Sequence, residues 1–136
     1  MPIYHPVASL VSQLTAQYKN DPTTVEMSLC LKSSWSNPPT QAEVLASIIA
    51  DGIGYEGQDV TPTADATAVS GNAEITFADA SFSLSSSTLD YDAYCIVING
   101  TDVVYAESFS DTKTIDSAGS AHTFTNIKKR LSPVIG

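Results

Sequence analysis

The chain has 136 residues, of which 43% are hydrophobic and 15% are charged, as is typical of one folded domain with a single core. Fifteen acidic residues against six basic ones give a formal net charge of -9. Because like charges repel, neither nucleic acid nor an anionic membrane surface is expected as a partner. The apolar runs are too short to span a bilayer. The first 14 residues lack the charged start and apolar block of a signal peptide, so synthesis in the cytoplasm is expected.

Residues 1–23 predict an N-terminal arm that carries a short helix. Over residues 8–18 the apolar side chains recur at roughly helical spacing, at Leu10, Val11, Leu14 and Tyr18. An amphipathic helix of this kind docks either on its own body or on a neighbouring subunit. We include Leu10 and Leu14 among the candidate interface residues.

Residues 24–127 predict the body. In the first expected strand, residues 24–32, apolar side chains alternate with polar ones, at Val25, Met27, Leu29 and Leu31. A loop over residues 33–40 follows and holds Trp35, the only tryptophan. We interpret Trp35 as a lid over the core edge, with an interface anchor as the alternative.

Residues 40–50 predict the one helix inserted in the body. Thr40 and Glu43 have the spacing of a capping box. The apolar residues of this helix form one stripe: Val44, Leu45, Ile48 and Ile49. Gly52 and Gly54 are expected to end it.

Shorter strands and loops are expected on either side of one hairpin. Residues 55–62 indicate an edge strand, residues 63–72 an exposed loop, residues 73–77 and 82–84 two short strands, and residues 122–127 a last strand. In residues 91–107, two β-type runs flank Asn99-Gly100, a dipeptide that tolerates the positive φ angles of a type I′ turn. The first run is apolar on both faces, as expected of a central strand covered on each side.

These elements predict a mainly β fold: an antiparallel β-sandwich or jelly-roll-like barrel with one inserted short helix and a short N-terminal helix. No internal repeat and no linker divides the chain.

No motif in the chain indicates catalysis, so no enzyme is expected. His5 and His122 have no neighbouring motif that would pair them with a nucleophile, and the sequence lacks Gly-x-Ser-x-Gly, a phosphate loop, Cys-x-x-Cys and His-x-x-x-His. No cofactor and no metal site is predicted. Asp51, Glu56 and Asp59 stand among glycines as a calcium loop would, but a solvated helix exit is the better interpretation.

Two cysteines, Cys30 and Cys95, lie in apolar strand-like runs. We interpret them as buried free thiols rather than a bridge, since cytoplasmic synthesis keeps thiols reduced.

Residues 128–136 predict a C-terminal tail that is first basic and then apolar. Residues 20–127 hold all 15 acidic residues and only two lysines, a net charge of -13, whereas Lys128, Lys129 and Arg130 follow directly. This basic run either solvates a frayed end or docks on an acidic neighbouring subunit, helped by Val134 and Ile135. In the second case, deletion of residues 128–136 is expected to weaken attachment without unfolding the body.

The order of four segments resembles small virion structural proteins of tailed bacteriophages. The segments are Thr24-Val-Glu-Met-Ser-Leu-Cys-Leu-Lys-Ser-Ser, Gly54-Tyr55-Glu-Gly, Ala73-Glu-Ile-Thr-Phe-Ala-Asp and Tyr91-Asp-Ala-Tyr-Cys-Ile-Val-Ile. The resemblance covers roughly residues 8–127 and lies in the pattern of strands and turns along the chain. It implies a β-rich, non-enzymatic protein that is made in the host cytoplasm and assembled in many copies on the virion.

The function expected from this resemblance is that of a capsid decoration or cement protein, a homo-oligomer (dimer or trimer) that binds the major capsid protein or other virion subunits. The alternative is a minor tail, baseplate or fibre component that binds a host surface, with Trp35, Tyr55, Tyr91 and Tyr105 as candidate sugar-binding aromatics. A cellular interaction domain unrelated to virions is a third interpretation.

Overall fold

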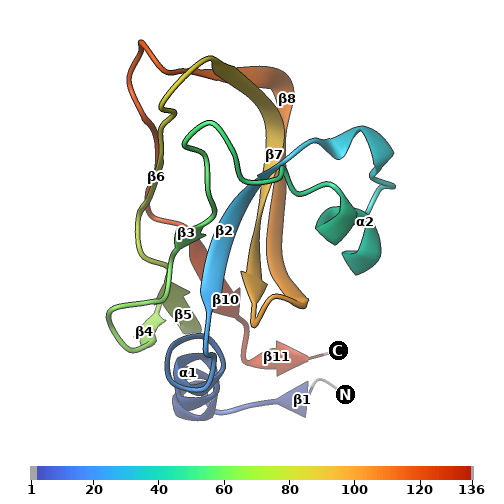
Figure 1. Ribbon diagram of the computed structural model, residues 1–136. Coiled ribbons are helices and arrows are strands. Elements are labelled where there is room, and N and C mark those ends of the chain that lie inside the picture. The colour runs from blue at the N-terminus through green and yellow to red at the C-terminus, as the bar shows by residue number, and fades with distance from the viewer. Residues whose placement is uncertain (1–2, 136) are drawn as a thin grey trace.

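A computed structural model describes residues 3–135 as an antiparallel, mainly β protein (Figure 1). The helical segments are α1 (Val7–Thr15), a π-helical turn (Ala16–Asn20), a 3-10 turn (Lys32–Ser34) and α2 (Gln41–Ala46). The strands are β1 (Ile3–Tyr4), β2 (Val25–Cys30), β3 (Gln58–Asp59), β4 (Thr67–Val69), β5 (Asn72–Thr76), β6 (Ala80–Phe82), β7 (Thr88–Ile98), β8 (Asp102–Asp116), β9 (His122–Phe124), β10 (Lys128–Leu131) and β11 (Val134–Ile135). The predicted sandwich-like β fold with an inserted helix and an N-terminal helix is confirmed.

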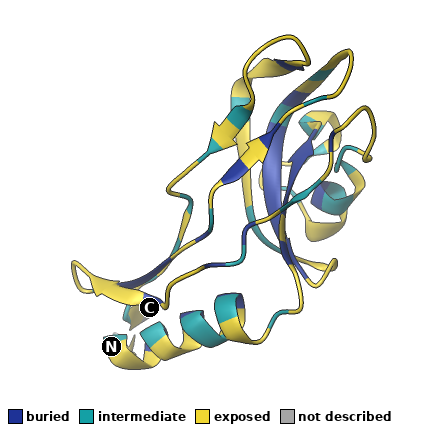
Figure 2. Cartoon of the chain, turned by 60° about the vertical axis from the view of Figure 1, so that its left-hand side comes forward, coloured by how far each residue is buried: buried dark blue, intermediate teal, exposed yellow. Residues whose placement is uncertain are grey.

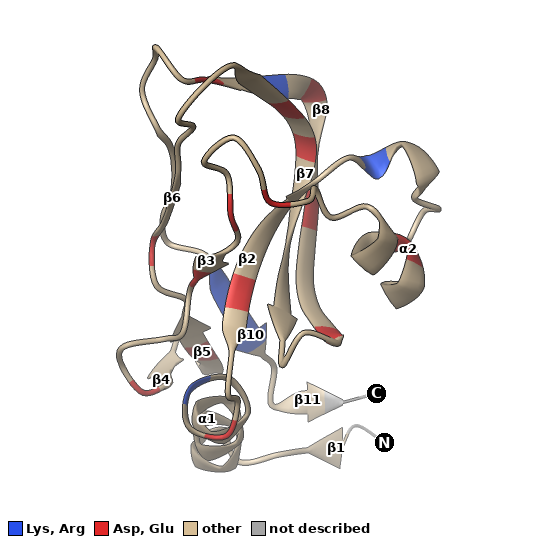
Figure 3. Ribbon diagram, viewed as in Figure 1, with Lys and Arg blue, Asp and Glu red and all other residues tan. Residues whose placement is uncertain are grey.

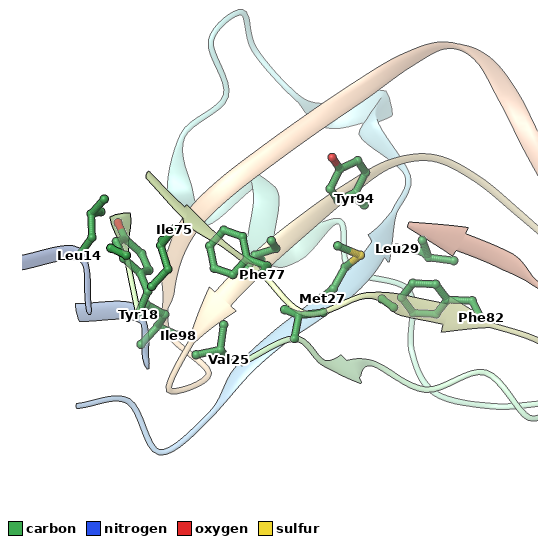
Figure 4. Packing of buried hydrophobic residues seen from close by; sticks show 14 of the residues in the cluster. Leu14, Tyr18, Val25, Met27, Leu29, Ile75, Phe77, Phe82, Tyr94 and Ile98 are labelled. Carbon is green, nitrogen blue, oxygen red and sulfur yellow. The ribbon is translucent and has the colours of Figure 1, made fainter. Parts of the chain in front are cut away.

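The strands form four antiparallel sheets. The largest has the order β3-β2-β7-β8, and a three-stranded sheet has the order β10-β5-β4. Two small sheets pair β6 with β9 and β1 with β11. The main core lies between the large sheet and the smaller sheets, as the labelled side chains in Figure 4 show. Helix α1 closes one end of this core against β4 and β5 (Figure 2).

The predicted hairpin forms β7 and β8 of the large sheet. Both strands are longer than the sequence indicated. Asn99 and Gly100 have φ angles of 53° and 74°, as a type I′ turn requires. The side-chain oxygen of Asn99 also accepts hydrogen bonds from the backbone N–H groups of Thr23 and Thr24, at 2.8 and 3.3 Å. Asn99 thus serves the turn and also ties the end of the hairpin to the start of β2.

Both faces of β7 are covered, as predicted. Tyr94, Ile96 and Ile98 enter the main core. Ala93, Cys95 and Val97 enter a second, smaller core beneath α2, together with Cys30 and Val44. The central strand is therefore buried on each side, which is the physical reason for its continuous apolar run.

Helix α2 has the predicted capping box but is shorter than predicted. Thr40 and Glu43 exchange the two hydrogen bonds of the box. The helix ends at Ala46 rather than residue 50, because the next residues run beside β2: the N–H of Leu31 donates to Ser47 O at 3.1 Å, and the N–H of Ile49 donates to Leu29 O at 3.0 Å. The backbone groups of residues 47 and 49 thus find their hydrogen-bond partners on the β2 segment instead of in a further helical turn.

A tight turn follows and brings two backbone segments together. Ile53 and Gly54 have φ angles of 49° and 88°, and the N–H of Tyr55 donates to Gly52 O at 2.8 Å. A Cβ atom on Gly54 would lie 2.5 Å from the backbone nitrogen of Ser85, so only glycine fits there. Ile53, by contrast, is a β-branched residue in the left-handed region, with its side chain exposed.

Two segments predicted as irregular are strands. Residues 63–72 contain β4, which pairs with β5. The basic run predicted as a tail is β10, in register with the other edge of β5, Lys129 opposite Ile75. The expected boundary at residue 128 is therefore wrong, since β10 belongs to the body.

Candidate functional site

The N-terminal helix packs on its own chain. Leu14 is 0% exposed, and Leu10 and Tyr18 are buried beside it in the main core. The edge of the Tyr18 ring meets the Phe77 ring at a centroid distance of 5.9 Å. Leu14 is thus corrected from a candidate interface residue to a core residue, because a side chain without exposed surface offers nothing to a partner. Leu10 is a core residue as well, and only the 7% of it that stays exposed faces a groove.

The basic run at residues 128–130 also contacts the body. Glu74 on β5 is only 5% exposed, and it forms an ion pair with Arg130 and lies 4.0 Å from Lys128 Nζ. Lys129 Nζ donates to Val104 O on the edge of β8, at 3.2 Å. Lys128 and Arg130 thus neutralise one buried carboxylate, and Lys129 caps one edge carbonyl. The interpretation of these three residues as a free docking arm is replaced by a structural one.

What remains of the two predicted arms is a ribbon made from the chain's two ends, which we call the terminal ribbon: β1 with β11. Ile3 pairs with Ile135 and Tyr4 with Val134 through the backbone. The N–H of His5 donates to Pro133 O at 2.8 Å and extends the ladder. In Figure 1 this ribbon extends from the base of the molecule beside α1.

The terminal ribbon carries exposed apolar side chains. Six large hydrophobic side chains are exposed in the described part of the chain, and three of them lie here: Ile3 (61%), Tyr4 (66%) and Val134 (48%). The side chain of the remaining candidate, Ile135, lies outside the described residues. Tyr4 and Val134 are cross-strand partners and share one face of the ribbon, while Ile3 points to the other face. Exposed apolar residues that lie side by side mark interaction sites more often than single scattered ones do.

The ribbon is also free of formal charge, unlike the rest of the surface. Residues 3–18 contain no Asp, Glu, Lys or Arg, and neither do residues 131–135. Figure 3 shows acidic residues along the large sheet and its loops, while β1 and β11 carry none. A shallow groove of about 350 Å³ adjoins the ribbon and is lined by His5, Leu10, Gln13, Leu131 and Ser132. The ribbon and groove form a neutral, partly apolar surface at one end of an acidic protein.

Trp35, the other predicted anchor, is half-buried. It packs against the small core beneath α2, and its indole N–H donates to Ser47 Oγ at 2.9 Å. Its remaining surface lines a groove of about 490 Å³ together with Asn37, Pro39, Asp92 and Ser108. Trp35 is therefore a lid, as interpreted, and it also forms one wall of a polar groove.

Searches against protein-family models, characterised proteins and solved structures found no match to this chain.

Three buried tyrosines, Tyr55, Tyr91 and Tyr94, hold hydrogen bonds in the core. Burial is the main cause that raises the pKa of Tyr94, whose hydroxyl donates to the Glu107 carboxylate. Burial also raises the pKa of Tyr55 to about 12, and this hydroxyl accepts the N–H of Leu29 at 2.9 Å. Tyr91 and His122 share a hydrogen bond of 2.6 Å. These phenols stay protonated at neutral pH and satisfy polar groups inside the sandwich. Tyr55 and Tyr91 are buried and so are unavailable for the sugar stacking considered above.

The acidic residues weighed as a calcium loop are not gathered around one point. Within residues 3–135, no three His, Cys, Asp or Glu side chains stand close enough to hold a metal ion. Asp59 instead accepts hydrogen bonds from the N–H and hydroxyl of Thr61, which lower its pKa. None of the helices in the described part of the chain combines the length and apolar character needed to cross a bilayer.

Proposed function

We propose that this chain is a non-enzymatic virion protein of the tailed-bacteriophage type, a capsid decoration or cement protein that docks through its terminal ribbon. One observation carries the proposal: an uncharged, apolar ribbon extends from a body that is otherwise strongly acidic. The resemblance of the strand and turn pattern to small virion structural proteins supports the choice of partner.

The ribbon suits docking by strand addition. A two-stranded sheet is at best marginally stable alone, and this one joins only two residues of each strand. The outer edges of β1 and β11 have no neighbouring strand among the described residues. A partner that supplies a strand would satisfy their free N–H and C=O groups and place its own side chains beside Tyr4 and Val134, which share one face.

The small size of the ribbon favours many weak contacts. Specific interfaces bury roughly 800 Å² on each partner, more than two pairs of residues can supply. A homo-oligomer, a dimer or trimer, would present several ribbons to one shell and raise their effective concentration. Each copy that binds only the assembled shell then stabilises it by mass action, with the major capsid protein or another virion subunit as the partner.

A minor tail, baseplate or fibre component is the second candidate, and the groove beside Trp35 favours it. An indole wall with Asn37, Asp92 and Ser108 near it is the composition of a sugar-binding groove, which would serve attachment to a host surface. Copy number separates the two: hundreds of copies on each particle indicate decoration, and tens or fewer indicate the tail.

The test compares two variants in a shell-binding assay. The variant with both Tyr4→Ser and Val134→Ser removes apolar surface from the ribbon. Leu31→Ser removes an apolar side chain elsewhere that is 45% exposed, close to the 48% of Val134. Each purified protein is sedimented with particles assembled from the capsid protein encoded near its gene. We expect the control to bind like the wild type and the ribbon variant to bind at least about tenfold more weakly, since two apolar contacts are lost.

Two results would contradict the proposal. One is equal binding by the ribbon variant, and the other is a wild-type protein that does not sediment with the particles. The melting temperature of all three proteins is measured alongside, so that unfolding is not mistaken for lost binding. Deletion of residues 128–136, which the sequence suggested as the test, is unsuitable because it removes β10 from the body.

A further inference from the structure

The two cysteines face each other across adjacent strands. Cys30 on β2 and Cys95 on β7 are both free and fully buried, with their sulfur atoms 3.6 Å apart. Sixty-four residues separate them along the chain, so only the pairing of β2 with β7 brings them together.

Their position in the sheet explains the close approach. The register pairs Cys30 with Ala93 and Cys95 with Ser28, so the two cysteines are diagonal neighbours on the same face. Alanine and serine are small, and they leave the diagonal free for the two thiols to lean toward each other. A disulfide has an S–S length of about 2.05 Å, so bond formation needs an approach of about 1.5 Å more.

We propose that Cys30 and Cys95 form a reversible redox pair, a dithiol under reducing conditions and an intramolecular disulfide after exposure to a peroxide. The inference does not depend on what the terminal ribbon binds. It adds a modification site inside the sheet, and the bond would join the chain across its two central strands.

The environment assigns different roles to the two sulfurs. The Cys30 thiol donates to the Cys95 sulfur at 3.6 Å. This contact is the main cause that lowers the pKa of Cys30, against the opposing effect of burial and with a smaller lowering contribution from Ser47. The same contact and burial raise the pKa of Cys95. We assign the first step of the oxidation to the Cys30 thiolate and the closing step to Cys95.

The reaction balances with one peroxide. The Cys30 thiolate attacks one peroxide oxygen, the O–O bond breaks, and the departing oxygen leaves as water after it takes up protons. This step leaves a sulfenic acid on Cys30. The Cys95 sulfur then attacks the Cys30 sulfur, the S–O bond breaks, and the hydroxide takes the Cys95 proton and leaves as a second water. The two cysteines lose two electrons, and these reduce the peroxide.

A peroxide reaches the two cysteines only if α2, which covers them, moves away. Val44 and the half-buried Trp35 and Leu45 pack over the two sulfurs in the small core. Helix α2 has only six residues, and of these only Val44 is buried, so this cover is among the parts of the molecule that open most easily. Oxidation then requires opening of α2 and not unfolding of the sheet.

The experiment treats the purified, folded chain with hydrogen peroxide and follows its mass and melting temperature. We expect the loss of two hydrogen atoms from a single chain, no free thiols after denaturation, and a melting temperature higher by about 10 °C, because the bond closes a long loop. A reducing agent should reverse all three. In Cys95→Ala the second step is blocked, and we expect a sulfenic acid at Cys30 that reacts with dimedone.

Three outcomes would overturn the proposal: both thiols survive the treatment in the folded protein, the new bond links two chains, or the oxidised protein melts at a lower temperature. Val44→Ala tests the route, since a looser cover should speed oxidation severalfold, whereas Ala42→Ser at an exposed position of the same helix should not. Equal rates for the two variants would refute access through α2. The wild-type comparison needs no substitution, so a variant that fails to fold leaves the main test intact.

Discussion

Replacement of Leu14 by alanine tests whether α1 is a core element or a docking arm. The side chain is fully buried against β5 and the main core. If α1 belongs to the body, the variant is destabilised even as an isolated protein. If α1 served mainly a partner, the isolated protein would be almost unaffected.

The magnitude follows from the burial. Leucine to alanine removes three carbon atoms, worth roughly 2.4 kcal/mol at about 0.8 kcal/mol for each buried methylene. The cavity left behind adds to this, because the sheet relaxes only in part, and similar substitutions cost about 2 to 5 kcal/mol. We therefore expect a loss of about 3 kcal/mol in the free energy of unfolding. For a chain of this length that corresponds to a fall of about 10 °C in melting temperature.

Urea unfolding followed by circular dichroism and by the fluorescence of Trp35 measures this loss. Gln13→Ala is the matched control, since Gln13 lies on the exposed side of the same helix and carries the same change to alanine. It should change the free energy of unfolding by less than about 0.5 kcal/mol. A loss below about 1 kcal/mol for Leu14→Ala, at an unchanged dependence on urea, would refute the assignment of α1 to the core.

Three further predictions concern local features of the body. Thr40→Ala removes half of the capping box and should lower the free energy of unfolding by about 1 kcal/mol, measured by urea titration. Ile53→Asn should raise it by about 0.5 to 1 kcal/mol, because asparagine tolerates the positive φ angle that strains a β-branched residue. Burial raises the pKa of Tyr55 to about 12, above its ordinary value of 10.0. The unfolded chain therefore loses this proton first, stability falls as the pH rises through this range, and Tyr55→Phe should show a smaller fall.

Each of these has an outcome that contradicts it. A Thr40→Ala protein as stable as the wild type would mean that the box adds nothing to α2. Lower stability in Ile53→Asn would show that the exposed isoleucine makes contacts that outweigh its strain. For Tyr55, the control is Tyr4→Phe at an exposed position. If the stability of both variants falls equally as the pH rises, the titration of Tyr55 does not cause the fall.

The elements that the sequence predicted correctly are those whose signal is local. The Thr40–Glu43 box lies within four residues, and the Asn99-Gly100 turn needs only two residues that accept positive φ. The alternation in β2 likewise follows from which side chains one sheet face buries. Such patterns predict their local structure from a few neighbouring residues, without information from the rest of the chain.

The errors all came from partners distant in sequence. The run at residues 128–130 is typical of a solvated end, and nothing near it in sequence shows that the buried Glu74 of β5 lies opposite Arg130. The end of α2 was misplaced because residues 47–49 pair with β2, about 18 residues earlier in the chain. The terminal ribbon joins the two ends of the chain, so no window of the sequence contains it.

The sequence by itself determined the mainly β class, the hairpin at the centre of the sheet, the capped helix and the acidic character of the body, because each depends on neighbouring residues or on composition. Only the tertiary structure decided which apolar and charged residues remain available to a partner. Burial and ion pairing depend on contacts between distant segments. These contacts buried Leu10 and Leu14 in the core and paired Lys128 and Arg130 with the buried Glu74. The same contacts left Ile3, Tyr4 and Val134 exposed and brought Cys30 beside Cys95.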